Sequence, residues 1–311
     1  LHTLYITNNP NEIGKKHLLD TAEDGTTYSQ VHKKYHLYLR EFLEEHGYYD
    51  IFIVDTQGNV AYTVFKELDF ATNLLNGQWK DTDLAKVYKA IMAQESAEDV
   101  SFVDFEPYAP SNNVPAAFIG RPIEDENGKR VGALIYQMPI EKMNAIFNDT
   151  SGLGETGKVM LVGDDKLLRN DVRFAKESTI LKLKADNPQV TDALAGNHGV
   201  ALDATDYNGT PVISAYENFK FKGANYALIA EMNRDEVMAP VVEKRNQFLM
   251  FAGGFVAIMT LLGVLFSRGI TKAISRITGA MKKVADGELE AEVPHLSRKD
   301  EIGAMASALQ V

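Results

Sequence analysis

The sequence of 311 residues contains no cysteine, so no disulfide bond stabilises it. This fits an oxidising compartment, where a protein of this size needs no disulfide staples. A basic surplus is also missing, because 32 lysine and arginine residues face 43 aspartate and glutamate residues. Residues 247–311 hold seven basic and six acidic side chains, which leaves 25 and 37 for residues 1–246. The acidic balance of residues 1–246 argues against nucleic acid as a partner.

Charge is absent from one long stretch, residues 248–266, which is mostly apolar. As a helix with a rise of about 1.5 Å per residue, it spans roughly 28 Å, the thickness of the hydrocarbon core of a bilayer. A helix in the core of a soluble protein rarely runs this long without a charge. We therefore predict a transmembrane helix over residues 247–266.

The charges that flank this stretch predict its orientation. Five basic residues follow it before the first acid, Asp286: Arg268, Lys272, Arg276, Lys282 and Lys283. The positive-inside rule places this end in the cytoplasm, although Lys244 and Arg245 on the other side weaken the contrast. We predict an inner (cell) membrane protein with one visible span and with residues 1–246 outside the cytoplasm. We also expect further chain at both ends, since no signal or first membrane segment precedes Leu1 and the last helical pattern stops in its middle.

Residues 1–246 contain an internal repeat. Residues 50–64 read as strand, polar turn and strand, and residues 157–169 repeat that pattern. Residues 115–147 read as two strands joined by a turn and followed by a helix, and this order recurs in residues 210–232 with a helix from Arg234. Two tandem copies of one antiparallel α+β unit are predicted, each of roughly 100 residues.

Ahead of the first copy, apolar residues recur at helical spacing over residues 28–46. The order of helix, two α+β units and membrane helix, with phrases such as residues 49–55 and 133–136, resembles the double Cache sensor of bacterial transmembrane receptors. That resemblance implies an α+β fold in which a long N-terminal helix carries two stacked PAS-like modules. The expected parts are a helical stalk at residues 1–48, a membrane-distal module at 49–150 and a membrane-proximal module at 151–246.

The end of the chain carries a second resemblance. Apolar residues at spacings of 4, 3, 4 and 3 form a coiled-coil seam: Ile270, Ile274, Ile277, Met281 and Val284. A connector with residues 286–289 and 300–303 leads to a second seam that begins at Ile302, Met305 and Leu309. This combination resembles a HAMP linker over residues 267–311, the parallel four-helix bundle of dimeric receptors, although Ala273 stands where such linkers usually have proline. The resemblance implies that the signal is relayed by Ile274, Ile277, Met281, Leu289 and Glu301.

Residues 298–311 are particularly similar to the linkers of methyl-accepting chemotaxis proteins. The similarity implies a homodimeric chemotaxis receptor that is no enzyme and reaches cytoplasmic signalling partners through chain beyond Val311. Histidine kinases and cyclic-dinucleotide enzymes use related linkers, so the sensor part of such an enzyme is the alternative.

No catalytic set of residues is visible in residues 1–246, and no cofactor is expected. His32 and His36 share a helix face at a spacing that can bind a metal, with His17 as a third candidate. A merely solvated or packed helix face explains them more simply, so no metal is expected. The glycine-rich residues 152–157 precede a strand and lack the lysine of a phosphate loop, so they are interpreted as a hinge.

A small-ligand cavity is expected where loops cover one face of a PAS-like sheet. In the membrane-distal module the covering segment, residues 65–87, contains the only tryptophan. Aromatic walls and a few polar groups suit a small polar metabolite, and the candidate ligand-binding residues are Trp79, Asp104, Tyr108, Ser111, Asn112, Phe118 and Arg121. Core packing of Trp79 and Tyr108, and simple surface positions for Asp104 and Arg121, are the competing interpretations.

The charge of the ligand stays open. Amino-acid-binding Cache receptors have a Trp-Tyr pair in the covering segment with an arginine shortly before it, whereas Lys80 follows Trp79 here, so that motif does not carry over. An anion could meet Lys66, Lys80 or Arg121, and an amine could meet Asp104. The membrane-proximal module offers only a sparse wall, made of Asp203, Asp206, Tyr207 and Tyr216. We therefore expect that module chiefly to transmit the signal, and the sequence leaves open whether it also binds a ligand.

Overall fold

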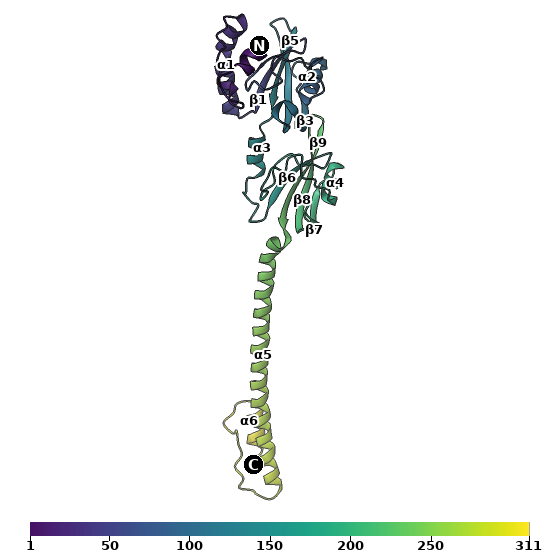
Figure 1. Cartoon of the computed structure of the whole chain (residues 1–311). Coiled ribbons are helices and arrows are strands. Elements are labelled where there is room, and N and C mark those ends of the chain that lie inside the picture. Colours follow the sequence, from purple (N-terminus) through teal and green to yellow (C-terminus); the bar gives the residue numbers. More distant parts are fainter. Residues whose placement is uncertain (311) are drawn as a thin grey trace. The chain divides into compact units, whose positions relative to one another are not determined.

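A computed structural model describes residues 1–310 (Figure 1). Val311, with which the expected HAMP segment ends, lies outside the described residues. The chain forms two compact units that meet between Val237 and Met238. The first unit contains two antiparallel β-sheets, and the second contains most of one long helix and a short one.

The first unit begins with a π-helical turn at Thr3–Thr7 and a 3-10 turn at Lys16–Leu18, followed by helix α1 at Thr27–His46. The Thr26 hydroxyl caps α1 by accepting a hydrogen bond from the Ser29 backbone N–H at 3.2 Å. Gly47 ends the helix in the left-handed region, with φ of 69°, and donates its N–H to the Leu43 carbonyl. A residue without Cβ adopts this conformation at little cost, which explains why the helix stops here.

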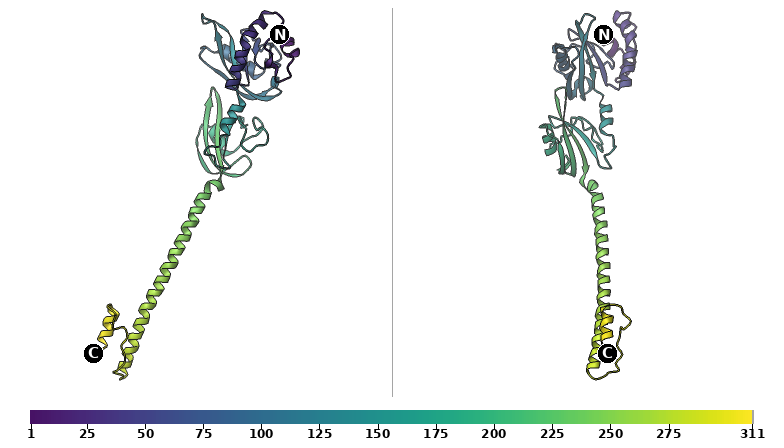
Figure 2. Two further views of the ribbon diagram at one scale, coloured as in Figure 1. Left: turned by 90° about the vertical axis from the view of Figure 1, so that its left-hand side faces the viewer. Right: turned by 180° about the vertical axis from the view of Figure 1, so that it is seen from behind.

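The first sheet has five strands in the order β2-β1-β5-β4-β3. Successive side chains of β1 point to opposite faces of the sheet. Ile51 packs in the cluster that includes Leu43 of α1, and Phe52 packs in the cluster that includes Leu84 of α2. Figures 1 and 2 show α1 and α2 on opposite sides of this sheet. Its elements are β1 (Asp50–Asp55), β2 (Val60–Thr63), α2 (Asp83–Ala93), β3 (Ser101–Tyr108), a 3-10 turn (Ala109–Ser111), β4 (Val114–Glu124) and β5 (Arg130–Gln137). We call this sheet with α1 and α2 the first-sheet module.

The second sheet has four strands in the order β6-β9-β8-β7. Its core packs Met160, Val162 and Ile229 against Val190 and Ala193 of α4. Its elements, after the linking helix α3 (Ile140–Phe147), are β6 (Lys158–Gly163), α4 (Pro188–Leu194), β7 (Gly199–Thr205), β8 (Pro211–Phe221) and β9 (Ala224–Asn233). We call this sheet with α4 the second-sheet module.

The second module departs from the strand, turn and strand expected over residues 157–169. Only β6 is a regular strand, and the following segment forms the isolated bridges Val162 to Leu168 and Leu167 to Lys184. The physical reason is local: the Asn170 side chain accepts the Leu161 N–H at 2.7 Å, so a side chain takes the place of a ladder hydrogen bond.

Helix α5 runs from Arg234 to Ala285 and contains the apolar residues 248–266. Among residues 1–310 it is the one helix that is long and apolar enough to span a membrane. The short helix α6 (Glu301–Ala308) is capped by Asp300, whose carboxylate accepts the Gly303 N–H at 3.2 Å. A Cβ on Gly303 would lie 2.0 Å from the Arg298 carbonyl oxygen, so this turn requires glycine.

Candidate functional site

A cavity of about 130 Å³ opens in the first-sheet module where three segments meet. The N-terminal segment contributes Ile6, Ile13, Gly14 and Lys16, the segment after β2 contributes residues 65–68, and the turn after β3 contributes Pro110 and Asn112. Apolar walls therefore face a few polar groups: Lys16, Lys66, Glu67 and Asn112. The volume suits a molecule of a few heavy atoms, because a drug-sized ligand needs roughly 300 Å³ or more.

Lys66 places a fully buried amine at this cavity. Its side chain extends from a backbone with φ of 57°, and the residue is 1% exposed. Its Nζ donates to the Thr63 carbonyl oxygen at 2.7 Å and lies 4.7 Å from the centre of the Tyr62 ring. The rings of Tyr5 and Phe70 stand at 5.8 and 5.6 Å, so the ammonium sits in an aromatic cage. Burial lowers the pKa of Lys66 to about 7, and the negative charge of Asp50 opposes that shift.

Two buried aspartates next to this segment keep free oxygen atoms. Asp50 accepts the Ile51 and Val64 backbone N–H groups at Oδ1, while its Oδ2 has no partner within residues 1–310. Asp69 accepts the Tyr108 hydroxyl at 2.6 Å through Oδ2, and its Oδ1 also lacks a partner in this part of the chain. Burial raises the pKa of Asp69 to about 7. Unpaired buried oxygens are uncommon in folded proteins, so the region has unused hydrogen-bonding capacity.

Glu67 forms the acidic side of the cavity. Its carboxylate accepts the Ser111 hydroxyl and, at 3.3 Å, the Tyr49 hydroxyl. Burial raises the pKa of Glu67 above its usual value. Asn112, with φ of 55°, follows in the left-handed conformation that asparagine tolerates better than most residues. The cavity wall thus combines a buried amine, a half-buried carboxyl group and a side-chain amide.

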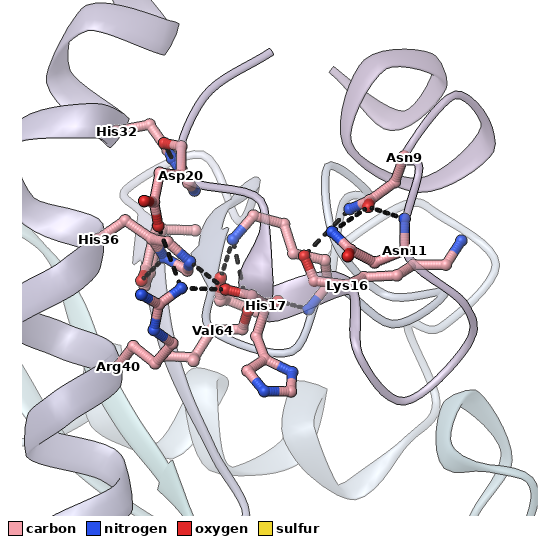
Figure 3. A network of polar contacts seen from close by, with 12 residues as sticks. Asn9, Asn11, Lys16, His17, Asp20, His32, His36, Arg40 and Val64 are labelled. Atoms are coloured by element: carbon pink, nitrogen blue, oxygen red, sulfur yellow. Dashed lines mark hydrogen bonds and ion pairs between the residues drawn. The ribbon is translucent and has the colours of Figure 1, made fainter.

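The N-terminal segment is held on the module by side chains of α1. Figure 3 shows His36 and Arg40 pointing at the His17 carbonyl oxygen, to which they donate at 2.7 and 2.9 Å. On the other flank the Asn9 amide donates to the carbonyl oxygens of Tyr5 and Lys16, which closes the loop that lines the cavity. This network fixes the position of Lys16.

His32 and His36 help to hold the N-terminal segment against α1. His36 donates from Nε2 to the His17 carbonyl, which leaves Nδ1 to accept the Tyr62 hydroxyl at 2.7 Å. His32 contacts the Asp20 carbonyl oxygen through Nδ1 at 2.7 Å, and the two rings stack at 4.3 Å. Burial lowers the pKa of His32 to about 3 and that of His36 to about 4. No group of three potential metal ligands occurs among residues 1–310.

The structure brings only some of the predicted ligand-binding residues to the cavity. Asn112 lines it, and Tyr108 and Ser111 bond to Asp69 and Glu67 beside it. Phe118 is fully buried in the core of the sheet, where its ring meets that of Tyr108 edge to face. Trp79 is half-buried against the same core and donates from Nε1 to the Leu68 carbonyl at 3.1 Å.

Asp104 and Arg121 lie elsewhere. Arg121 is exposed on β4. Asp104 connects the two modules, because its carboxylate accepts Arg169 Nε at 2.8 Å and the Tyr226 hydroxyl at 2.6 Å. Arg169 and Tyr226 stand 65 and 122 residues further along the chain, and the sequence carries no local signal for this pairing.

The residues expected to line a pocket in the second module contact other side chains of that module. Asp206 pairs with Lys158 at 2.6 Å, Tyr216 donates to Asp192 at 2.7 Å, and Arg234 pairs with Asp203 at 2.5 Å. Tyr207 lies under the Lys158 ammonium, with 4.5 Å between Nζ and the ring centre.

The expected relay residues divide into buried and exposed sets. Ile277 is 1% exposed and packs with Ala273 against Ile302 and Ala306 of α6. By contrast Ile274, Met281 and Leu289 are 42%, 49% and 83% exposed, and Glu301 is exposed as well. The face of α5 that α6 covers is therefore centred on Ala273, Ile277 and Ala280, and the rest of the expected seam is uncovered.

Comparison with known proteins identifies the large first part of the chain. A model of the Cache domain matches residues 7–241, well over half of the sequence. The chain belongs to the Cache domain family. A model of the HAMP domain matches residues 265–311, so the Cache domain is followed by the apolar helix and a HAMP domain.

A curated relative is similar over most of the chain. The probable chemoreceptor y4sI of Sinorhizobium fredii is 23% identical over 291 residues, which cover 91% of this chain and 35% of the relative. The chain thus spans about a third of the length of that relative.

Solved sensor domains are similar at low identity. The periplasmic sensory domain of the Campylobacter jejuni chemoreceptor Tlp1 is 13% identical with a TM-score of 0.46, over 77% of this chain and 90% of that one. The ligand-binding domain of the Pseudomonas aeruginosa chemoreceptor PctC, in complex with GABA, is also 13% identical, with a TM-score of 0.43 over 70% and 84%.

Proposed function

We propose that this Cache-domain protein is the sensing and relay part of a transmembrane chemoreceptor. The observation that carries the proposal is the cavity of about 130 Å³ with Lys66, Glu67 and Asn112 in its wall, in a chain that continues into an apolar helix and a HAMP domain. An amine, a carboxyl group and an amide in one cavity wall can orient a small polar molecule through hydrogen bonds. The similarity to a probable chemoreceptor supports this function.

In this proposal the first sheet with α2 is the membrane-distal Cache module, residues 49–150, and the second-sheet module belongs to the membrane-proximal one, residues 151–246. The stalk, residues 1–48, completes the wall of the distal cavity. The ligand occupies the cavity of the distal module, while Tyr108 and Ser111 hold the acidic groups beside it. Asp104 is assigned to the contact between modules, because both of its oxygens already accept hydrogen bonds.

The sensor lies outside the cytoplasm and the HAMP domain inside it, since five basic residues follow the apolar stretch. The chain works as a homodimer whose HAMP helices use the exposed Ile274 and Met281 as their shared seam. Asn127 and Ser297 are exposed, and the chain has no native cysteine. A membrane-impermeant thiol reagent on intact cells should therefore label a cysteine at Asn127 and not one at Ser297, and the reverse pattern would invert the orientation.

The ligand site is tested with two neighbouring asparagines. Asn112 and Asn113 both have positive φ and are both exposed, but only Asn112 lines the cavity. Glycine tolerates this backbone at either position, so Asn112→Gly and Asn113→Gly differ mainly in the lost cavity amide.

The whole chain in lipid nanodiscs should be screened by thermal shift against small polar metabolites. We expect a stabilising metabolite to bind roughly ten- to hundredfold more weakly to Asn112→Gly and almost unchanged to Asn113→Gly. Equal binding by both variants would place the ligand outside this cavity.

A further inference from the structure

A second and larger cavity, of about 510 Å³, lies in the second-sheet module. Its wall contains two cationic residues, Lys158 and Arg173, one acidic residue, Glu155, and the polar residues Tyr207, Asn208 and Asn233. A lining in which two cations outnumber one carboxylate, and which also contains two amides, suits a ligand that carries negative charge and accepts hydrogen bonds.

The two cations differ in how their charge is balanced. Lys158 is 7% exposed, and its Nζ lies 2.6 Å from Asp206, so most of its charge is compensated inside the protein. Arg173 donates from Nη1 to the carbonyl oxygens of Gly154 and Gly157, at 3.2 and 3.0 Å. These partners are neutral, and within residues 1–310 Arg173 forms no ion pair, although it is close enough to Glu236 for its charge to help lower the pKa of that carboxyl group. The other nitrogen atoms of the guanidinium can therefore donate to a ligand.

Phe174 holds that guanidinium at the rim of the cavity. Its ring centre lies 4.6 Å from the Arg173 guanidinium carbon, although the residue is 65% exposed and has φ of 74°. A bulky residue in this conformation is strained, and such strain gathers at binding sites more than elsewhere. An apolar ring over one face of the guanidinium excludes water there and strengthens its attraction to an anion.

The cavity wall is also the place where helix α5 is held at its start. Glu236 lies in the first turn of α5, and its carboxylate accepts the backbone N–H groups of Glu155 and Thr156 at 2.8 and 2.9 Å. The Thr156 hydroxyl donates to the same carboxylate and accepts the Asn233 N–H at 3.1 Å. Glu155, Thr156 and Asn233 all line the cavity, so a ligand there would touch the residues that fix the first turn of the helix.

We propose that this cavity binds a small organic anion with one or two carboxylate groups, held chiefly by Arg173, and that its occupancy tightens the hold of Glu155 and Thr156 on Glu236. A cationic ligand would be repelled by Arg173, which forms no ion pair within residues 1–310, and is disfavoured. The site is separate from the cavity of the first-sheet module and independent of whether that cavity binds a ligand.

Binding should be measured by calorimetry on the whole chain in lipid nanodiscs, with succinate and citrate as anions and succinamide as the neutral control. We expect saturable binding of at least one anion and none of succinamide. Arg173→Gln should weaken that binding roughly ten- to hundredfold, Arg173→Lys should weaken it less because the charge stays, and the exposed Lys182→Gln should leave it within twofold.

Hydrogen exchange gives the second readout. The bound anion should slow exchange of the Glu155 and Thr156 amides in the wild type and in Lys182→Gln, a change that a structural role for Arg173 alone would not produce. The proposal is overturned if neither anion binds at millimolar concentration, if succinamide binds equally well, or if Arg173→Gln binds like the wild type. It also fails if Asn112→Gly, rather than Arg173→Gln, removes the binding, since the anion would then occupy the first cavity.

Discussion

Lys66 shows at the scale of one residue how the fold creates an unusual chemical group. Its amine is enclosed by Tyr5, Tyr62 and Phe70, which come from three different segments, and its hydrogen-bond acceptors are backbone carbonyls. An ammonium ion loses much of its hydration in such a place, and aromatic faces replace only part of it. The low pKa of Lys66, about 7, follows from that loss.

The same group makes stability depend on pH. The unfolded lysine keeps its proton up to a pKa of about 10.4, whereas the folded one releases it near 7, so the unfolded chain binds more protons between these values. Stability should therefore rise with pH, by about 2 to 3 kcal/mol between pH 7.5 and 9.5. Melting temperatures of the wild type and Lys66→Met at both pH values check this, and an equal slope in the two proteins would contradict it.

Asp104 links the two modules. Its replacement tests whether this residue acts only in the contact between the modules or also binds the ligand. Asp104→Asn removes the negative charge that pairs with Arg169, a side chain that is 5% exposed. We expect the free energy of unfolding to fall by about 1 to 3 kcal/mol. Ligand affinity in the first cavity should stay within a fewfold of the wild type. A double-mutant cycle with Tyr226→Phe measures the coupling. Loss of ligand binding in Asp104→Asn with the melting temperature unchanged would instead make Asp104 a ligand-binding residue.

At the scale of elements, the pairing of α5 with α6 rests on one small apolar patch. Ile277 and Ala273 meet Ile302 and Ala306, and each is at most 8% exposed. Ile277→Asp buries a charge in this patch at a cost of several kcal/mol, enough to release α6. Amide exchange in α6 should rise sharply, whereas the exposed Ser275→Asp should change it little. Unchanged protection of α6 in Ile277→Asp would rule out this patch as the contact that holds the helix.

Elements with a strong local pattern can be predicted from the sequence. The apolar stretch at residues 248–266 lies within α5, and apolar spacing over residues 28–46 coincides with α1 at Thr27–His46. Helix α2 is not among the predicted elements, although Leu84, Val87, Tyr88 and Ile91 have helical spacing and form its buried face. Residues 65–87 are interpreted as one covering segment, and this segment ends within the second turn of α2. The helical spacing is therefore split between two predicted segments and is not recognised.

At the scale of the whole molecule, long-range contacts decide the candidate site, and no local pattern encodes them. The sequence predicts only a helical stalk over residues 1–48, yet within it Tyr5 is fully buried and Lys16 lines the cavity. Asp104 has the chemistry of a ligand-binding residue, but Arg169 and Tyr226 take both of its oxygens. Periodicity reports which face of an element is buried, but not which distant side chain meets it.

For the sensing and relay part of a chemoreceptor that we propose, occupancy of the first cavity changes the packing of the HAMP helices. Ile274 is 42% exposed on α5 and the chain has no cysteine, so Ile274→Cys reports contact between copies without background. The measurement is the rate of disulfide cross-linking of this variant in nanodiscs, with and without the metabolite found in the thermal-shift screen. The proposal predicts a change of twofold or more that disappears when Asn112→Gly is added. A metabolite that binds in the cavity and leaves the rate unchanged would contradict it.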